Sequence, residues 1–248
     1  MLESIYRLAN NAVIAPIHLE TIMGNLANAQ MPGYKSKRLS VHSFTEELAT
    51  AQDHELENYA SLRAARTDWS QGALKPTGRT LDFALNGSGF FAVKTHDGKE
   101  LLTRNGSFIL DKEGVLVTRE GYTVEGEGGE LRFDIRDNLD LVRVRPDGSV
   151  YVRSAQGNRL VGKLKLLAPK ENRLRRLGEL YFEVSDPRRR VPKAEKVTVV
   201  NTFLEQANIN PIGEMARMIE VTRNFQLTQN VLNKLSQLQS EHIKLNNG

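Results

Sequence analysis

The first thirty residues alternate apolar and polar positions with the period of a helix that packs along another helix. Apolar residues recur at alternating spacings of three and four, at Ile5, Leu8, Ala12, Ala15, Leu19, Ile22 and Leu26. This heptad spacing is typical of a helix seam. Pro32 cannot extend a helix, so the pattern predicts a helix that ends near Ala29. Pro16 lies inside this helix, where proline costs roughly 3 kcal/mol, and we expect a kink there.

A second seam of the same kind lies at the other end of the chain, in Pro211–Leu245. Its members are Met218, Val221, Phe225, Thr228, Leu232 and Leu235. Pro211 and Glu214 are typical of a first helical turn, so the helix should begin there. An isolated amphipathic helix is marginal in water, and each terminal helix is the only comparable partner for the other. We therefore expect a coiled-coil-like pair, which a monomer could also form as a simple hairpin. The residues expected to make this packing are Leu8, Leu19, Ile22, Leu26, Met218, Phe225, Leu232 and Leu235.

Between Trp69 and Val200 the apolar period changes to two. Leu81, Phe83 and Leu85 alternate with smaller or polar residues, which is typical of a half-buried strand. The further runs, separated by turn residues, are Phe90–Val93, Leu101–Thr103, Phe108–Leu110, Val115–Thr118, Tyr122–Val124, Leu141–Val144, Val150–Val152, Leu160–Leu167, Leu180–Val184 and Val197–Val200. A hairpin turn is predicted at 96–99. Short strands at this spacing predict a central antiparallel β-sandwich or barrel-like domain.

Together these patterns predict an α+β protein with four segments. Residues 1–34 form an N-terminal helical segment, 35–68 a connector, 69–207 a β-rich domain, and 208–248 a C-terminal helix that pairs with the first segment. The connector is polar and weakly patterned, and only Phe44, Leu48 and Ala51 keep helical spacing in it.

The composition is that of an ordinary globular protein of 248 residues, with 40% hydrophobic and 26% charged residues. The absence of cysteine excludes disulfides, thiolate metal sites and cysteine nucleophiles. No apolar run is long enough to span a bilayer. The first helix does not have the features of a secretory signal, because it lacks a basic start and Glu3 and Glu20 interrupt it. A protein of this kind would leave the cytoplasm by a route that reads no cleaved signal.

The net charge of +4 is unevenly distributed along the chain. The stretch Arg159–Lys196 holds twelve Lys and Arg against five Asp and Glu. Such a stretch could meet nucleic acid, an acidic wall polymer or an acidic protein face. A solvated surface is the simpler interpretation, and we favour it.

Catalytic and cofactor patterns are not found in the sequence. The five histidines, which are His18, His42, His54, His96 and His242, include no pair with metal-ligand spacing. The glycine-rich segments 87–89 and 126–129 match neither a nucleophile elbow nor a dinucleotide fingerprint. Trp69, Phe90, Phe91 and Phe108 are expected in the core rather than on a platform for nucleic-acid bases. We expect no enzyme activity, no cofactor and no metal.

Five ordered motifs extend from one end of the chain to the other. They are Asn25–Asn28 with Pro32–Lys35; Thr77–Arg79 with Leu81–Leu85 and Gly87–Phe91; Thr103–Phe108; Gly114–Thr118; and Asn208, Pro211, Glu214, Met215, Met218, Ile219, Arg223 and Phe225. Together they resemble the signatures of the axial proteins of the bacterial flagellar rod and hook. The residues that carry the signature best are Asn25, Leu26, Asn28, Pro32, Gly33, Asn208, Pro211, Glu214 and Arg223. Met31 stands where the family usually has threonine. The short segment between Tyr34 and Trp69, and residues 121–131, most resemble proximal-rod members, and distal-rod members come next.

The resemblance implies a structural subunit of the basal-body rod. It would polymerise helically with copies of itself and with other rod proteins, and it would transmit torque from motor to hook in flagellum-dependent motility. The terminal segments would be assembly helices and the β-rich domain an outer layer. The family implies export through the flagellar type III apparatus to a periplasmic rod, without a cleaved signal, without membrane embedding and without nucleic acid.

Two alternatives remain open from the sequence. The first is a distal-rod or hook-type axial subunit. The second is a soluble binding module that uses the basic stretch 159–196, whose binding to phosphates would weaken steeply with salt.

Overall fold

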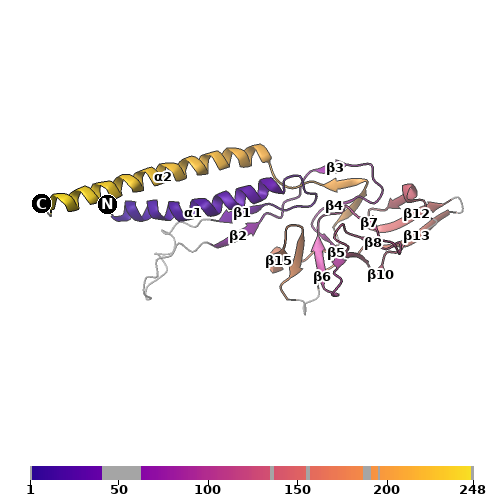
Figure 1. Ribbon diagram of the computed structural model, residues 1–248. Helices are drawn as coiled ribbons and strands as arrows, with labels where there is room; N and C mark the ends of the chain where they lie inside the picture. The colour runs from indigo at the N-terminus through magenta and orange to yellow at the C-terminus, as the bar shows by residue number, and fades with distance from the viewer. Residues whose placement is uncertain are drawn as a thin grey trace. The chain divides into compact units, whose positions relative to one another are not determined.

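A computed structural model describes residues 2–40, 63–134, 137–154, 157–186, 191–194 and 196–246. The described chain contains two long helices and eighteen short β-strands, which confirms the predicted α+β class (Figure 1). The chain divides into two compact units, each described by itself. The helical unit comprises residues 1–27, 37–68 and 209–248, and the β unit comprises 28–36 and 69–208.

In the helical unit, α1 (Leu2–Ala27) and α2 (Pro211–Asn246) lie against each other (Figure 1). Helix α1 is continuous through Pro16 and ends two residues before the predicted position. Helix α2 begins at Pro211, as the proline and Glu214 predicted. The side chain of Asn210 accepts a hydrogen bond from the Gly213 amide at 3.3 Å and so caps the first turn. Neither described helix is apolar enough along its length to cross a membrane.

The described ends of the predicted connector are strands, β1 (Lys37–Ser40) and β2 (Arg63–Thr67), which pair antiparallel within the helical unit. Their sequences are polar and have no apolar alternation, so the pattern gave no sign of them. The helical spacing at Phe44, Leu48 and Ala51 lies outside the described residues.

The β unit is built of short antiparallel strands. They are β3 (Leu74–Pro76), β4 (Phe83–Asn86), β5 (Phe90–Lys94), β6 (Glu100–Thr103), β7 (Ile109–Leu110), β8 (Leu116–Val117), β9 (Thr123–Gly126), β10 (Gly129–Glu130), β11 (Val142–Val144), β12 (Ser149–Ser154), β13 (Gly157–Lys163), β14 (Leu166–Leu167), β15 (Leu174–Leu177), β16 (Tyr181–Val184), β17 (Thr198–Asn201) and β18 (Phe203–Glu205). Short 3₁₀ turns lie at Leu139–Leu141 and Glu171–Arg173.

The largest sheet has the strand order β15-β16-β6-β5-β9-β8-β7, with β10 added to β9 and β14 added to β5. Strands β11, β12 and β13 form a separate antiparallel sheet. The first strands of the unit pair with its last, β4 with β17 and β3 with β18. The chain therefore enters and leaves the β unit at neighbouring positions.

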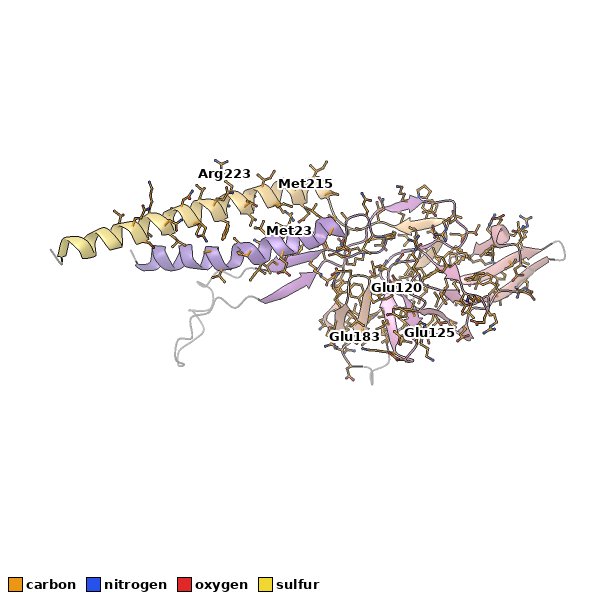
Figure 2. All side chains as sticks on the ribbon, viewed as in Figure 1. Met23, Glu120, Glu125, Glu183, Met215 and Arg223 are labelled. Carbon is orange, nitrogen blue, oxygen red and sulfur yellow. The ribbon has the colours of Figure 1, made fainter. Side chains whose placement is uncertain are left out.

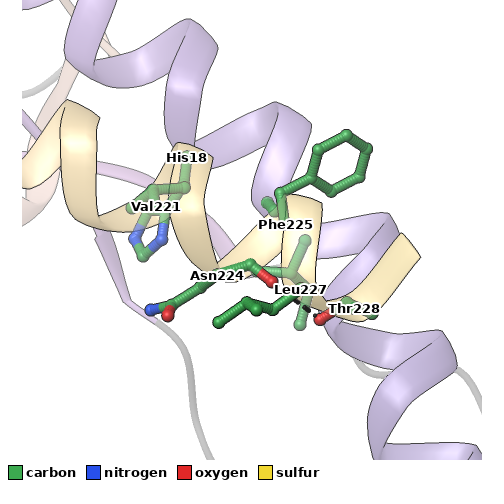
Figure 3. A pocket seen from close by; sticks show the side chains of 8 residues that line it. His18, Val221, Asn224, Phe225, Leu227 and Thr228 are labelled. Carbon is green, nitrogen blue, oxygen red and sulfur yellow. Dashed lines mark hydrogen bonds between the residues drawn. The ribbon is translucent and has the colours of Figure 1, made fainter. Parts of the chain in front are cut away.

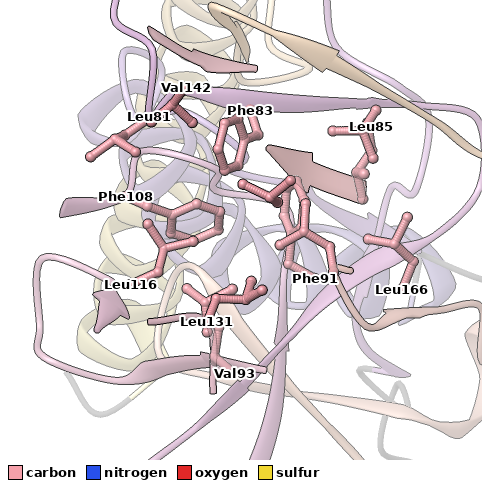
Figure 4. Close-up of a cluster of buried hydrophobic side chains, with 14 of the residues drawn as sticks. Leu81, Phe83, Leu85, Phe91, Val93, Phe108, Leu116, Leu131, Val142 and Leu166 are labelled. Carbon is pink, nitrogen blue, oxygen red and sulfur yellow. The ribbon is translucent and has the colours of Figure 1, made fainter. Parts of the chain in front are cut away.

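One large apolar cluster fills the β unit (Figure 4). It draws on strands of several sheets, and its members include Leu81, Phe83, Leu85, Phe91, Val93, Phe108, Leu116, Leu131, Val142 and Leu166. A second cluster is built around Phe90 and Phe182, and Trp69 packs on it with its ring 4.8 Å from that of Phe182. The predicted core positions of Phe90, Phe91 and Phe108 are confirmed, whereas Trp69 is half-buried.

The prediction of a half-buried strand at 81–85 was wrong. All five residues are buried: Leu81, Phe83 and Leu85 belong to the apolar cluster, and β17 pairs along the edge of β4. Asp82 is buried with them and its carboxylate lies 3.2 Å from the guanidinium of Arg79. The alternation of the sequence therefore marked a strand but not a solvent-exposed face.

The sequence pattern also missed strands β3, β10, β15 and β18, and it merged β13 and β14 into one run. These strands have two to seven residues. Several of them carry charged side chains, as in the Leu-Arg-Arg-Leu sequence of β15. Strands this short are decided by their neighbours in the sheet rather than by their own propensity.

Candidate functional site

The segment after α1 and the segment before α2 meet in the β unit. The Gly33 amide donates to the Glu205 carbonyl oxygen at 2.8 Å. The Ser36 amide donates to the side-chain oxygen of Asn208 at 2.7 Å. We call residues 28–36, 70–72, 104–106 and 203–208 the junction. Every chain segment that leads to a helix from the β unit passes through it.

A buried ion cluster of Lys35, Arg104 and Glu205 lies at the centre of the junction. These residues are 1%, 4% and 1% exposed. The ammonium of Lys35 lies 2.7 Å from Oε1 of Glu205, and Nη1 of Arg104 lies 3.1 Å from Oε2. One carboxylate therefore serves two buried cations, which lie 170 and 101 positions from it along the chain.

Hydrogen bonds to backbone groups add to the ion cluster, although Nε of Arg104 has no hydrogen-bond partner in the described chain. The Lys35 ammonium also donates to the Ser70 carbonyl at 2.7 Å, and the Gly72 amide donates to the Glu205 carboxylate at 3.0 Å. Nη2 of Arg104 donates to the carbonyl of Gly87 at 2.7 Å. Burial lowers the pKa of Arg104, and the Glu205 carboxylate opposes that shift. Each of these groups can stay charged while it is buried only because it has several partners at once.

Tyr34 and Arg176 close the junction on one side. Tyr34 is completely buried, and its ring lies 5.2 Å below the guanidinium of Arg176. The same guanidinium donates to the Lys35 carbonyl and lies 5.3 Å from the ring of Phe182. Burial raises the pKa of Tyr34, while the positive charge of Arg176 acts in the opposite direction. Strand β15 thus binds the segment that follows α1 through the side chain of Arg176.

Two glycines allow the backbones of the junction to approach closely. Gly33 has a φ of 74°, and a Cβ there would lie 2.3 Å from the backbone nitrogen of Asn105. A Cβ on Gly106 would lie 1.7 Å from the carbonyl oxygen of Phe83. These contacts explain why the segments 32–35, 81–91 and 103–108 carry glycine-containing motifs. Together with Asn208, four of the five sequence motifs meet here, whereas residues 114–118 lie at β8.

The signature asparagines hold the ends of the helices through their side chains. Asn208 donates to the Ser70 carbonyl and hydroxyl oxygens, both at 3.1 Å. Asn28 hydrogen bonds to the hydroxyl of Tyr34. In the helical unit, Asn25 is 2% exposed, and its amide donates to the Lys37 carbonyl and accepts from the Lys37 amide, both at 2.9 Å. Asn25 and Asn208 therefore act as backbone clamps, whereas Asn28 binds a side chain.

Replacing Asn25 with alanine should destabilise the helical unit by about 1–3 kcal/mol, because both backbone groups of Lys37 lose their partner. The measurement is denaturant unfolding followed by circular dichroism. Gln30→Ala, at an exposed turn position, is the matched control and should change the free energy of unfolding little. Equal effects of the two changes would show that the clamp contributes nothing.

The residues predicted to pack the helices occupy varied environments. Ile22 is 5% exposed, and Leu19, Leu26, Met218, Phe225, Leu232 and Leu235 are half-buried. The side chain of Leu8 lies outside those described. A cleft of about 330 Å³ separates α1 and α2 and is lined from both helices, with His18, Asn224 and Phe225 among its walls (Figure 3). Its lining side chains are mostly apolar or neutral, with His18 as their one histidine and no carboxylate among them.

Sequence reasoning missed the ion cluster as a unit. Lys35 and Arg104 stood inside motifs, but nothing distinguished their charges from surface charges. Glu205 follows three residues that have no strand signal of their own, so nothing marked it. The signal that could have pointed to the cluster is the position of two cations beside motif glycines, Gly33 and Gly106.

The basic stretch 159–196 is largely neutralised by ion pairs. Lys165 pairs with Glu100 and with Glu125, the latter at 2.7 Å. The other pairs are Arg159 with Asp137, Lys163 and Lys193 with Glu127, Arg175 with Glu183, and Arg176 with Glu179. Glu125 and Glu183 are labelled among the side chains of the β unit in Figure 2. This pairing favours a structural surface over a polyanion site; residues 188–190 lie outside the described chain.

The described residues contain no cluster of metal-ligating side chains. No group of three or more His, Asp or Glu there could hold a metal ion. Two aspartates near turn glycines, Asp111 and Asp147, have backbone roles. Asp111 accepts from the Val115 amide at 2.7 Å, and Asp147 accepts from the Ser149 amide at 3.1 Å. They stabilise turns, as the neighbouring glycines suggested.

Comparison with known proteins gives concordant matches. Residues 84–152 match the model of the flagellar hook protein FlgE/F/G D1 domain, and residues 200–245 match that of the flagellar basal body rod FlgEFG protein C-terminal region. The flagellar basal-body rod protein FlgG of Buchnera aphidicola is 32% identical over 90% of this chain and 94% of its own length. FlgF of Mesorhizobium japonicum is 28% identical over 98% of both chains, and FlgF of Escherichia coli is 29% identical over 85% of both.

Proposed function

We propose a function from one premise, that this chain belongs to the family of flagellar basal-body rod and hook proteins. The chain is FlgF-like and is a structural subunit of the flagellar rod. The observation that carries this conclusion is the end-to-end similarity to rod proteins, which includes the FlgG relative at 32% identity.

The finer proposal is a proximal-rod subunit that polymerises helically with copies of itself and with other rod proteins. In that place it would transmit torque from motor to hook across the periplasm, after export by the flagellar type III apparatus. Full-length FlgF relatives and the short segment between residues 34 and 69 support this choice. A distal-rod, FlgG-type position is the second candidate, because FlgG relatives cover a similar share of the chain.

The helices are proposed to act as the assembly elements. Residues 1–34 and 208–248 would form a coiled-coil-like inner layer, with 35–68 as connector and 69–207 as a barrel- or sandwich-like outer domain. Helix α2 carries exposed apolar side chains at Ile212, Met215 and Ile219, which are 79%, 50% and 70% exposed. Figure 2 labels Met215 on α2 and Met23 on α1. Contacts of this kind between subunits must be heterologous, so that the assembly continues rather than closing.

The direct test is to image purified basal bodies from cells that carry a tagged version of this chain. We expect the tag along the rod, and we expect deletion of the gene to leave cells without hooks and without swimming. A tag that is absent from the basal body, with normal swimming in the deletion strain, would contradict the proposal. A tag confined to the motor side or to the hook side of the rod distinguishes the proximal from the distal position.

Replacing Leu232 with aspartate should weaken each helix contact by about 2–3 kcal/mol, because a charged carboxylate replaces a half-buried leucine at the seam. Leu26→Asp should weaken the helix contacts in the same way. Since the loss repeats in every subunit, rod incorporation and motility should fail. Asn233→Asp adds the same charge at an exposed neighbouring position and should assemble normally. Normal swimming in both leucine variants would show that these faces are not packed.

A further inference from the structure

The three-stranded sheet β11-β12-β13 has one face in the core and one facing outward. Val142, Val150 and Val152 are 0%, 0% and 3% exposed and belong to the large apolar cluster. Alternation along the strands places the intervening side chains on the opposite face. These are Arg143, Arg145, Tyr151, Arg153 and Leu160, which we call the arginine face.

Register and contacts show that the arginine face is a continuous surface. Arg143, Tyr151 and Leu160 lie directly opposite one another across the three strands. The guanidinium of Arg145 lies 4.4 Å from the centre of the Tyr151 ring, and its Nη1 donates to the Tyr151 hydroxyl at 3.2 Å. Arg153 follows two positions after Tyr151 on the same strand and therefore on the same face.

The charges of this face lack the carboxylate partners found elsewhere in the β unit. In the described chain, none of its three arginines forms an ion pair, whereas five of the seven arginines and lysines at 159–176 do, namely Arg159, Lys163, Lys165, Arg175 and Arg176. Arg143 donates only to the carbonyls of Asp140 and Val142. The carboxylates at the border already have partners: Asp147 accepts from Ser149, and Glu127 pairs with Lys163 and Lys193. The face therefore carries a local excess of positive charge.

The apolar side chains of the arginine face limit the kinds of partner that could bind to it. Leu160 is 55% exposed beside a tyrosine and three arginines. Arginine and tyrosine are enriched at the centres of protein interfaces, and arginine binds carboxylates through two parallel hydrogen bonds. A phosphate polymer would make no use of an exposed leucine. We propose that the arginine face docks an acidic protein segment that presents carboxylates around an apolar side chain. This contact lies outside the helices and is independent of the proposed rod function.

The test measures binding of the full chain to a fluorescein-labelled, glutamate-rich peptide with interspersed leucines, by anisotropy at physiological salt. Replacing both Arg145 and Arg153 with glutamine should weaken binding about tenfold or more, equivalent to about 1.4 kcal/mol. Leu160→Ser should also weaken it. The matched control replaces Arg119 and Arg132, two exposed arginines elsewhere in the β unit, and should bind as the unchanged chain does. Thermal unfolding of every variant checks that the fold is retained.

Two results would overturn the proposal. One is equal binding by the Arg145/Arg153 variant and the Arg119/Arg132 control, or no binding by the unchanged chain. The other is binding of leucine-free polyglutamate or duplex DNA as tight as that of the mixed peptide, with a steep loss on adding salt. That pattern would identify a general polyanion surface instead.

Discussion

Replacing Glu205 with glutamine is expected to destabilise the β unit by about 3–5 kcal/mol, one of the two largest effects expected for this chain. Glutamine keeps the size of the side chain and can still accept a hydrogen bond from Gly72. It removes the carboxylate that pairs with both Lys35 and Arg104, so two cations that are 1% and 4% exposed lose this shared counter-charge. The measurement is the free energy of unfolding in guanidinium chloride, followed by fluorescence of Trp69 in the β unit.

Glu127→Gln is the matched control for this change. Glu127 also serves two cations, Lys163 and Lys193, but at an exposed position. Exposed ion pairs contribute about 0–1 kcal/mol, so the control should unfold nearly as the unchanged chain does. If the two variants unfold alike, the buried ion cluster does not hold the junction together. We also expect Glu205→Gln to lose motility on warming before Glu127→Gln does.

Replacing Gly33 with alanine should destabilise the β unit by about 2–5 kcal/mol in total. A left-handed backbone costs a non-glycine residue about 1–2 kcal/mol, and φ at this position is 74°. Overpacking adds about 1–3 kcal/mol, because the new methyl would lie 2.3 Å from the nitrogen of Asn105 and 2.4 Å from the carbonyl carbon of Arg104. The obstacle is backbone, so no side-chain rotation relieves it.

Gly78→Ala separates the two causes. Gly78 has nearly the same φ, 75°, but a Cβ there meets nothing within 4 Å. It should therefore show only the backbone cost. Denaturant unfolding of the two variants side by side measures the difference, which is the energy of close approach at the junction. A Gly33→Ala variant no less stable than Gly78→Ala would mean that the junction has room to move.

The features that the sequence determined are local ones. Helical spacing and Pro211 located α2 to the residue, because a first-turn proline and a heptad seam act within a few positions. The hairpin at 96–99 follows from its turn residues, with Gly98 at a φ of 80°. Large aromatic residues such as Phe91 and Phe108 were assigned to the core because they have the most apolar surface to bury.

The candidate site could be predicted only in pieces. The motifs at 32–35, 103–108 and 208 were visible, and the resemblance they carry led to the correct family. The sequence did not predict that these motifs come together at the junction. The residue pairs that form it, such as Lys35 with Glu205, belong to segments that are far apart in the chain. The same holds for the arginine face, whose members are brought together by strand register rather than by spacing.

Tertiary structure decided which charges are buried, which strands exist and which faces are covered. A lysine, an arginine and a glutamate look like surface residues in any sequence window, and only their three-dimensional contacts offset the cost of removing them from water. Strands as short as β3 and β18 exist because they pair with each other, not because of their own residues. Asp82 alternates like a solvent-facing residue, yet it is buried, and its neighbours Leu81 and Phe83 belong to the apolar cluster. The sequence determined the periods and the turns, whereas burial depends on neighbours that periodicity does not encode.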